Sequence, residues 1–354
     1  MKRVFVVLFA ALSACSSTPG PDAGVDVWNN AGPYAVGVKT ITVETDGGRV
    51  LPVEVWYPAA ASARGGTFAV EDFESGAHRE TLSSWLAATP ERCSPRSALG
   101  ARDADVFDAS PRGLIVFSHC TECFRFSMHS LAARLASHGF VFAAADHVTN
   151  TGFDSTAQLN DAFLAVRAND VSAVITAMLE GPLPVDSSRV AVVGHSFGAV
   201  TTARVVELDS RVRAGFLIAA PADSPFLNSK GITRIQKPLS WLLAMEDNSI
   251  SFIGNEFIRE NFVKVPRPNW LVEVENAGHW SFSDIAGLGG SYRPGCGDGL
   301  RDPDGGAFTY LDNDVARAIA HRTITAWAAF VLDGNEAAKV ALGEAQAETH
   351  VRAR

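Results

Sequence analysis

Apolar positions along the chain form short continuous runs that alternate with segments of helical spacing. The continuous runs, typical of strands buried on both faces, lie at 113–118, 140–145, 190–193, 214–219, 239–244 and 270–274. Apolar residues recur every three or four positions at 128–137, 158–179, 199–208 and 315–332. Strands that alternate with helices predict an α/β fold with a mostly parallel central sheet covered by helices on both faces. We expect 270–274 to be the last strand and the helix 315–332 to close the chain.

An antiparallel hairpin is predicted ahead of this alternation. Apolar and polar residues alternate through 37–43 and 50–57, on either side of Asp46-Gly47-Gly48, and Pro58 is expected to end the second strand. The following stretch, 59–111, carries short helical patches, notably 79–88, among glycines, prolines and charged residues. We expect it to be an excursion over the sheet that helps to wall a pocket.

The first residues resemble an export signal. Lys2 and Arg3 precede an apolar run too short to span a bilayer, which predicts a signal peptide over 1–14. Leu12-Ser13-Ala14-Cys15 resembles a bacterial lipobox, in which Cys15 would carry the lipid, and an ordinary secretory signal with a chance cysteine is the alternative. We expect 15–27 to be a flexible tether and 28–354 a single domain. The lipid would attach the protein to a membrane of the bacterial cell envelope, where the domain would face the periplasm or the outside.

The charge balance argues against two classes of partner. The chain has 30 Lys and Arg against 39 Asp and Glu, a net charge of -9, and no basic block. Nucleic acid and electrostatic adhesion to anionic lipid are therefore not expected, and membrane attachment would depend on the lipid alone. We expect a monomer or a weakly associating chain.

The chemistry is expected to centre on Gly194-His195-Ser196-Phe197-Gly198. This G-x-S-x-G sequence follows an apolar strand and precedes a helical segment, as in a nucleophile elbow. The sharp turn would lift the Ser196 hydroxyl above the carboxyl edge of the sheet and point the Phe197 amide at a developing oxyanion. Glycine is needed on both sides because larger residues would collide with the neighbouring strand and helix.

A nucleophilic serine needs a histidine base and an acid, which follow in the order serine, acid, histidine. His279 comes just after the strand 270–274 and so at the same edge as Ser196, whereas His321 lies within the closing helix. Asp247 follows the strand 239–244, Asp223 follows the preceding strand, and Glu246 is a weaker third candidate for the acid. Placement along the chain favours Asp247.

Three blocks resemble the platelet-activating-factor acetylhydrolase and dienelactone-hydrolase-like group of α/β-hydrolases. They are Phe117-Ser118-His119, Ala136-Ser137-His138-Gly139-Phe140-Val141 and Gly194-His195-Ser196-Phe197-Gly198, within a likeness that spans about 36–332. The resemblance implies the α/β-hydrolase fold and an oxyanion hole formed by the backbone amides of Phe197 and Thr121. This chain has Cys120 and Glu122 where that group usually has glycines. In the acetylhydrolase branch the catalytic acid follows the strand one earlier, so Asp223 remains an alternative to Asp247.

Four cysteines remain after Cys15, and in an exported chain they predict disulfides. They are Cys93, Cys120, Cys123 and Cys296, and the three possible pairings stay open. We expect Cys296 to pair with one of the other three and to tie two loops of the site together. A C-x-x-C redox pair and a zinc set of His119, Cys120, Cys123 and His129 are weaker alternatives to cysteines that brace the loop. His119, His195, Asp146 and His147, which also follow strands, are expected to make buried structural hydrogen bonds.

These expectations together predict a serine hydrolase that cleaves small-molecule or lipid carboxylic esters through an acyl-enzyme. No metal and no organic cofactor are expected, and Trp280 and Phe282 could line the acyl pocket. One alternative keeps the triad and changes the substrate to a lactone, an amide or a polyester. The other is a surface lipoprotein that uses the hydrolase scaffold for binding without turnover.

Overall fold

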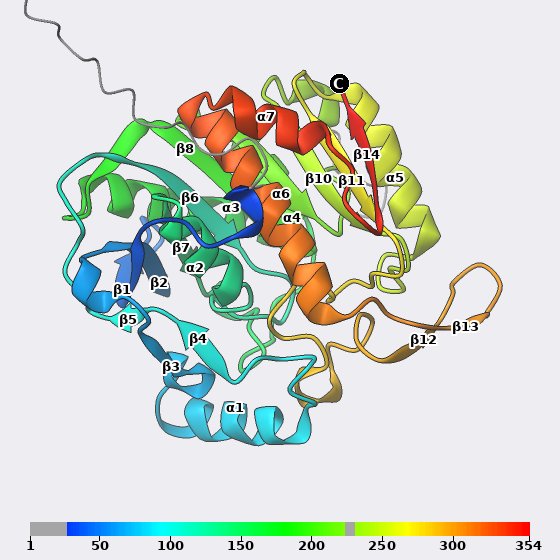
Figure 1. Cartoon of the computed structure of the whole chain (residues 1–354), viewed down its shortest axis with the longest axis horizontal. Coiled ribbons are helices and arrows are strands. Elements are labelled where there is room, and N and C mark those ends of the chain that lie inside the picture. Colours follow the sequence, from blue (N-terminus) through cyan, green and yellow to red (C-terminus); the bar gives the residue numbers. More distant parts are fainter. Residues whose placement is uncertain (1–26, 224–230) are drawn as a thin grey trace, which may run out of the picture.

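The computed structural model describes residues 27–223 and 231–354, and a ten-stranded sheet runs through them (Figure 1). The strand order is β14-β11-β10-β9-β8-β6-β7-β2-β1-β5. The strands are β1 (Ala35–Glu44), β2 (Val50–Ala59), β5 (Ala101–Arg102), β6 (Arg112–Ser118), β7 (Val141–Ala145), β8 (Val185–His195), β9 (Val212–Ile218), β10 (Leu239–Ala244), β11 (Trp270–Val274) and β14 (Thr349–Ala353). Every pairing from β7 to β11 is parallel, whereas β2 and β14 join this block antiparallel. The expected mostly parallel sheet is confirmed.

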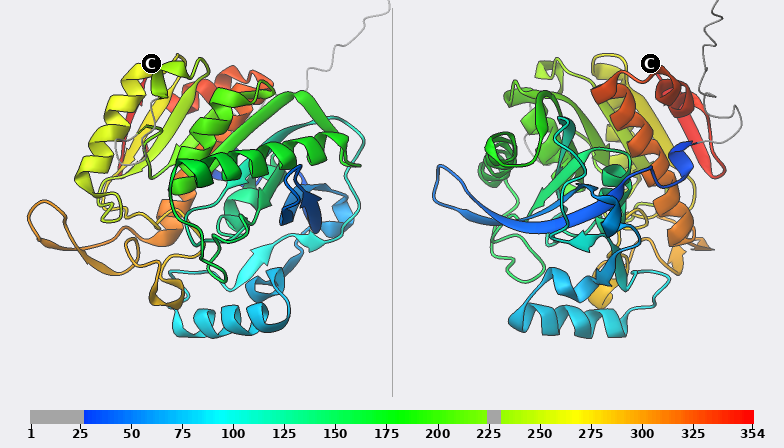
Figure 2. Two further views of the ribbon diagram at one scale, coloured as in Figure 1. Left: turned by 180° about the vertical axis from the view of Figure 1, so that it is seen from behind. Right: turned by 60° about the vertical axis from the view of Figure 1, so that its left-hand side comes forward.

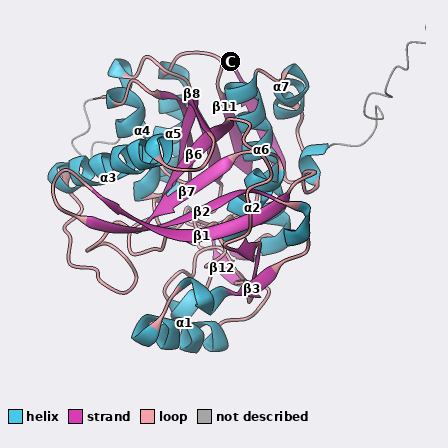
Figure 3. Ribbon diagram, turned by 90° about the vertical axis from the view of Figure 1, so that its left-hand side faces the viewer, coloured by secondary structure: helices cyan, strands magenta, loops and turns pink. Residues whose placement is uncertain are grey.

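Helices cover both faces of the sheet (Figures 2 and 3). The apolar residues of α2 (His129–Ser137), α6 (Asn313–Asp333) and α7 (Glu336–Gly343) belong to one buried cluster. Those of α3 (Asp161–Glu180), α4 (Phe197–Leu208) and α5 (Ser251–Lys264) belong to the other. In β6, Ile115 and Phe117 enter the first cluster, and Leu114 and Val116 enter the second. Side chains that alternate between two covered faces explain why these strands read as continuous apolar runs.

The α3 helix is, among the described residues, the one helix long and apolar enough to cross a membrane. Half of its apolar window is buried, and its apolar residues pack in the same cluster as those of α4. It therefore packs as a core helix, in the cluster that α3 shares with α4 and α5.

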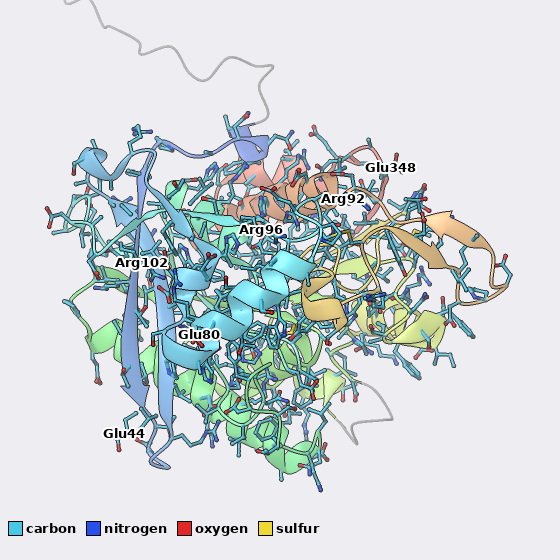
Figure 4. All side chains as sticks on the ribbon, turned by 90° about the horizontal axis from the view of Figure 1, so that it is seen from below. Glu44, Glu80, Arg92, Arg96, Arg102 and Glu348 are labelled. Atoms are coloured by element: carbon cyan, nitrogen blue, oxygen red, sulfur yellow. A yellow bond between two sulfur atoms is a disulfide. The ribbon has the colours of Figure 1, made fainter. Side chains whose placement is uncertain are left out.

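The excursion predicted at 59–111 lies at one end of the sheet, and Figure 4 shows the molecule from that end. It contains β3 (Thr67–Ala69), α1 (Gly76–Ala88) and β4 (Ser97–Leu99), and β3 pairs antiparallel with β4. Short 3-10 helices lie at η1 (Val27–Asn29), η2 (Ala61–Ala63), η3 (Val70–Phe73), η5 (Ile232–Arg234) and η6 (Leu288–Gly290).

The end of the chain differs from the sequence prediction. The strand β11 is not the last, because β12 (Asp298–Leu300) and β13 (Ala307–Thr309) form a hairpin and β14 pairs with β11. The α6 helix ends at Gly334, which is left-handed with φ 68°, and α7 follows it. Most of β14 is polar and at least partly exposed, so it lacks the apolar run by which the buried strands were recognised. The predicted N-terminal hairpin is confirmed, except that Pro58 lies inside β2, beyond the segment that pairs with β7.

Candidate active site

Ser196 lies at a sharp turn between the end of β8 at His195 and the start of α4 at Phe197. Its backbone has φ 57° and ψ -124°, a conformation that non-glycine residues rarely adopt. The turn has no room for larger neighbours: a Cβ on Gly194 would lie 2.0 Å from the Gly198 carbonyl oxygen, and one on Gly198 would lie 1.9 Å from the Ser118 carbonyl oxygen. Both flanking glycines are thus required by close backbone contacts, as the motif predicts.

His279 lies in the loop after β11 and is hydrogen bonded to Asp247. The distance from His279 Nδ1 to Asp247 Oδ2 is 2.7 Å, and both side chains are buried. The other oxygen of Asp247 accepts hydrogen bonds from the amides of Ser249 (2.9 Å) and Ile250 (3.1 Å). Because a carboxylate can only accept, His279 carries its proton on Nδ1 and keeps Nε2 free to act as a base.

The competing acids point elsewhere. The carboxylate of Asp223 accepts from the Ile232 amide at 3.3 Å, and Glu246 forms an ion pair with Arg301. Of the three candidates considered, Asp247 is the one that the structure brings to His279.

Two further histidines lie away from this pair. His321 is on α6 and shares a hydrogen bond with the Ser130 hydroxyl at 3.0 Å, and burial lowers its pKa to about 3. His350, which also follows the elbow in sequence, is on β14 and pairs with Glu275 at 2.6 Å. Neither histidine is among the residues that line the pocket beside Ser196.

The two amides expected to bind an oxyanion belong to α4 and to the loop after β6. The Phe197 amide is the first of α4, and the first amides of a helix have no partner within it. Thr121 lines the same pocket as Ser196 and His279. The loop is closed by a disulfide between Cys120 and Cys123, on either side of Thr121 and Glu122.

This disulfide counts against the zinc alternative, because it removes the two thiolates that a metal would need. Residues 27–223 and 231–354 contain no group of three or more side chains placed to hold a metal ion. The second disulfide joins Cys93 to Cys296, which answers the question of pairing that the sequence left open.

Polar residues that follow the strands make buried hydrogen bonds. The backbone amide of His147 donates to His119 Nε2 (2.9 Å), and the His147 side chain bonds to the Ser118 hydroxyl (2.9 Å) and to Asp170 (3.0 Å). Burial lowers the pKa of both His119 and His147 well below the usual range, so both stay neutral. His195 Nε2 donates to the carbonyl oxygen of His279 at 2.8 Å.

Asp146 is in a separate cluster and accepts from Arg125 at 2.6 Å. Together with the hydrogen bonds of His119, His147 and His195, this contact agrees with the expectation that these strand-end residues make structural hydrogen bonds.

The pocket next to Ser196 has a volume of about 370 Å³, and its wall combines aromatic rings with small and polar residues. Its lining includes the rings of Trp85, Trp280 and Tyr292. Trp85 lies on α1, so the excursion contributes to the wall, as expected. Phe282, which we also expected there, is instead buried in the core on the α6 side of the sheet.

Several contacts hold the excursion against the loop that follows His279. The Thr89 hydroxyl accepts from the Gly289 amide at 3.2 Å, and the Ser94 hydroxyl donates to the Ala286 carbonyl oxygen at 2.9 Å. The Cys93–Cys296 disulfide joins the same two segments. The two walls of the pocket, distant in sequence, are therefore fixed to each other.

Comparison with known proteins agrees with this fold. Residues 21–180 match the family described as platelet-activating factor acetylhydrolase, isoform II. A ferulic acid esterase from Streptomyces cinnamoneus is similar in structure, with a TM-score of 0.61 and 22% identity, over 85% of this chain and 91% of that one. At this identity the likeness shows the fold. The chain therefore has an α/β-hydrolase fold, and over residues 21–180 it resembles the platelet-activating factor acetylhydrolases.

Proposed function

We propose that this protein hydrolyses carboxylic esters through an acyl-enzyme on Ser196. The observation that carries the proposal is that His279, hydrogen bonded to Asp247, lines the same pocket as Ser196 at its strained turn. A serine hydroxyl is a weak nucleophile at neutral pH, and a neutral imidazole held by a carboxylate is the group that activates it.

The reaction would proceed in two halves. In the first, His279 Nε2 takes the proton of Ser196 while its oxygen attacks the ester carbonyl, and the amides of Phe197 and Thr121 bind the oxyanion. The protonated imidazole, stabilised by Asp247, then gives this proton to the leaving alcohol. In the second half, water loses a proton to His279 and attacks the acyl group, so that the carboxylic acid leaves and Ser196 regains its proton.

The pocket supports a short acyl group or one that contains a single ring. Three aromatic side chains line a cavity of about 370 Å³, and flat rings pack favourably against such walls. The structural neighbour is described as a ferulic acid esterase, which makes an aromatic acyl ester the second candidate. Nitrophenyl esters of acetate, butyrate, octanoate and cinnamate would separate these possibilities, with Ser196→Ala as the inactive control.

The rival functions give distinct results in the same assays. A lactonase, amidase or polyesterase would turn over its own substrate faster than any nitrophenyl ester. A binding protein without turnover would hydrolyse none of them and would resist labelling by a fluorophosphonate, which reacts with activated serines. Labelling at Ser196 without hydrolysis of any tested ester would mean that the substrate class is wrong.

We also propose, from the sequence alone, that a lipid on Cys15 attaches the protein to a membrane of the cell envelope. The signal segment 1–14, Cys15 and nearly all of the tether lie outside the described residues. Cys15→Ser should release the protein from the membrane fraction. An unmodified Cys15 in the native protein, found by mass spectrometry, would contradict the proposal.

A further inference from the structure

The loop that carries the Thr121 amide has an unusual backbone for its sequence. Glu122, the next residue, has φ 55°, in the left-handed region that glycine adopts freely and glutamate does not. A non-glycine residue persists there only when its surroundings hold it. The resemblance noted above would place glycines here, so this chain must fix the loop by other means.

Covalent and polar contacts hold the Glu122 peptide on both sides. The Cys120–Cys123 disulfide ties the two ends of the segment together. The hydroxyl of Tyr292 donates a hydrogen bond to the Glu122 carbonyl oxygen, and the Glu122 carboxylate accepts one from the Ser155 hydroxyl at 2.6 Å.

Tyr292 is well placed to act as this donor. It is 7% exposed, and burial raises its pKa, so the hydroxyl keeps its proton. Its ring packs edge-on against Trp280, with 4.9 Å between ring centroids. The backbone of Gly152 lies close to this hydroxyl: a Cβ on Gly152 would be 2.9 Å from the Tyr292 oxygen. The hydroxyl therefore has little freedom to move away from the Glu122 carbonyl.

We propose that Tyr292 and the Cys120–Cys123 disulfide are positioning groups for the Thr121 amide of the oxyanion hole. Neither needs to touch the reacting atoms: they fix the two ends of the short loop and the carbonyl of Glu122, the residue after Thr121, so that the Thr121 amide already faces the developing charge. The inference rests on the proposed function and adds to it the means by which a loop without glycines is preorganised.

This role predicts a particular kinetic signature. A preorganised amide acts on the transition state more than on the bound ester, so a displaced amide lowers kcat and leaves KM nearly unchanged. Loss of a whole oxyanion donor lowers kcat by about 10²–10³-fold. Because Tyr292→Phe removes only the hydroxyl that holds the loop, we expect kcat to fall by about 10–100-fold.

Tyr57→Phe is a matched control. The Tyr57 hydroxyl also donates to a backbone carbonyl, that of Ala104 at 2.7 Å, and the side chain is similarly buried at 2% exposure. Tyr57 is not among the residues that line the pocket. Its variant should keep wild-type kcat and KM.

A second readout separates positioning from general damage. A boronic acid forms a tetrahedral adduct with the serine that resembles the transition state, so its Ki should rise in Tyr292→Phe by about the same factor as kcat falls. The double variant Cys120→Ser with Cys123→Ser should likewise show a lower kcat, a nearly unchanged KM and a higher Ki for the boronic acid. Its loop is short, so this disulfide constrains the unfolded chain much less than Cys93–Cys296 does, and the thermal midpoint should fall by only a few degrees.

The inference is overturned if Tyr292→Phe keeps kcat within twofold of wild type. It is equally overturned if kcat falls while the Ki of the boronic acid stays the same, or if Tyr57→Phe loses as much activity. If the wild-type protein hydrolyses no ester and resists fluorophosphonate, the proposed function itself fails. An active wild type beside a normal Tyr292→Phe refutes the positioning role alone.

Discussion

Replacing Asp247 with asparagine should nearly abolish turnover, and the hydrogen bonds around it show why. One carboxylate oxygen accepts two backbone amides, from Ser249 and Ile250, and the other faces His279 Nδ1. An asparagine would keep its carbonyl oxygen towards the two amides, because turning the NH2 group to face two donors would lose two hydrogen bonds at about 1 kcal/mol each. The NH2 group would then point at His279.

The consequence is a change of histidine tautomer. With a donor facing Nδ1, the imidazole must accept there and carry its proton on Nε2, the nitrogen needed to take the proton of Ser196. A triad whose histidine is in this tautomer loses about ten-thousandfold in kcat, about 5.5 kcal/mol of transition-state stabilisation. Asp223→Asn is the control, because its carboxylate accepts only a long bond of 3.3 Å from the Ile232 amide among the contacts described for it.

The assay is steady-state hydrolysis of a nitrophenyl ester by both variants, with circular dichroism to verify folding. We expect Asp247→Asn to retain about 10⁻⁴ of wild-type kcat and Asp223→Asn to stay within about twofold, since it loses no contact to His279. A folded Asp247→Asn with a tenth or more of wild-type activity would refute the reasoning. A comparable loss of kcat in Asp223→Asn would instead identify Asp223, after the preceding strand, as the acid.

Three further predictions concern stability. Gly198→Ala places a methyl group 1.9 Å from the Ser118 carbonyl oxygen and should destabilise the fold by about 3 kcal/mol in urea titrations; an unchanged midpoint would show that the elbow can relax. Replacing Cys93 and Cys296 by serine removes a cross-link between residues 203 positions apart and should lower the free energy of unfolding by about 5 kcal/mol. The expected result is a drop of several degrees in Tm, and an unchanged Tm would contradict it. Burial lowers the pKa of His321 to about 3, so below about pH 6.5 the unfolded chain binds a proton that the folded chain does not. The free energy of unfolding should therefore fall with acidification by up to about 1.4 kcal/mol per pH unit. In His321→Asn it should fall less steeply with pH, and the same pH dependence in variant and wild type would contradict this role of His321.

The sequence predicted the parts of the fold in which apolar spacing and local backbone geometry agree. The buried strands from β6 to β11 have apolar residues on both faces, and the elbow has glycines that close backbone contacts require. Both features leave a local pattern of residues in the sequence, so they can be recognised without knowing the rest of the fold, although the carbonyl oxygen that Gly198 approaches belongs to Ser118 on β6. The C-terminal strand β14 could not be found this way, because it lies at the sheet edge and most of its residues are polar.

Contacts between distant segments were the harder part of the site. The Cys93–Cys296 pair and the position of Trp85 in the wall depend on how the excursion folds over the sheet, which no periodicity records. The hydrogen bond from Tyr292 to the Glu122 carbonyl joins residues 170 positions apart and left no pattern in the sequence. Glu122 in place of a glycine was the one available signal, since a side chain at a left-handed position implies a support elsewhere.

The central claim, an acyl-enzyme on Ser196, is tested most directly by trapping that intermediate. Wild-type protein mixed with a nitrophenyl ester and quenched in acid within milliseconds should gain the mass of one acyl group. Peptide mapping should place the group on the segment that contains Ser196, and Ser196→Ala should show neither the adduct nor turnover. Hydrolysis by the wild type with no adduct at Ser196, together with a tenth or more of wild-type activity in Ser196→Ala, would contradict the account.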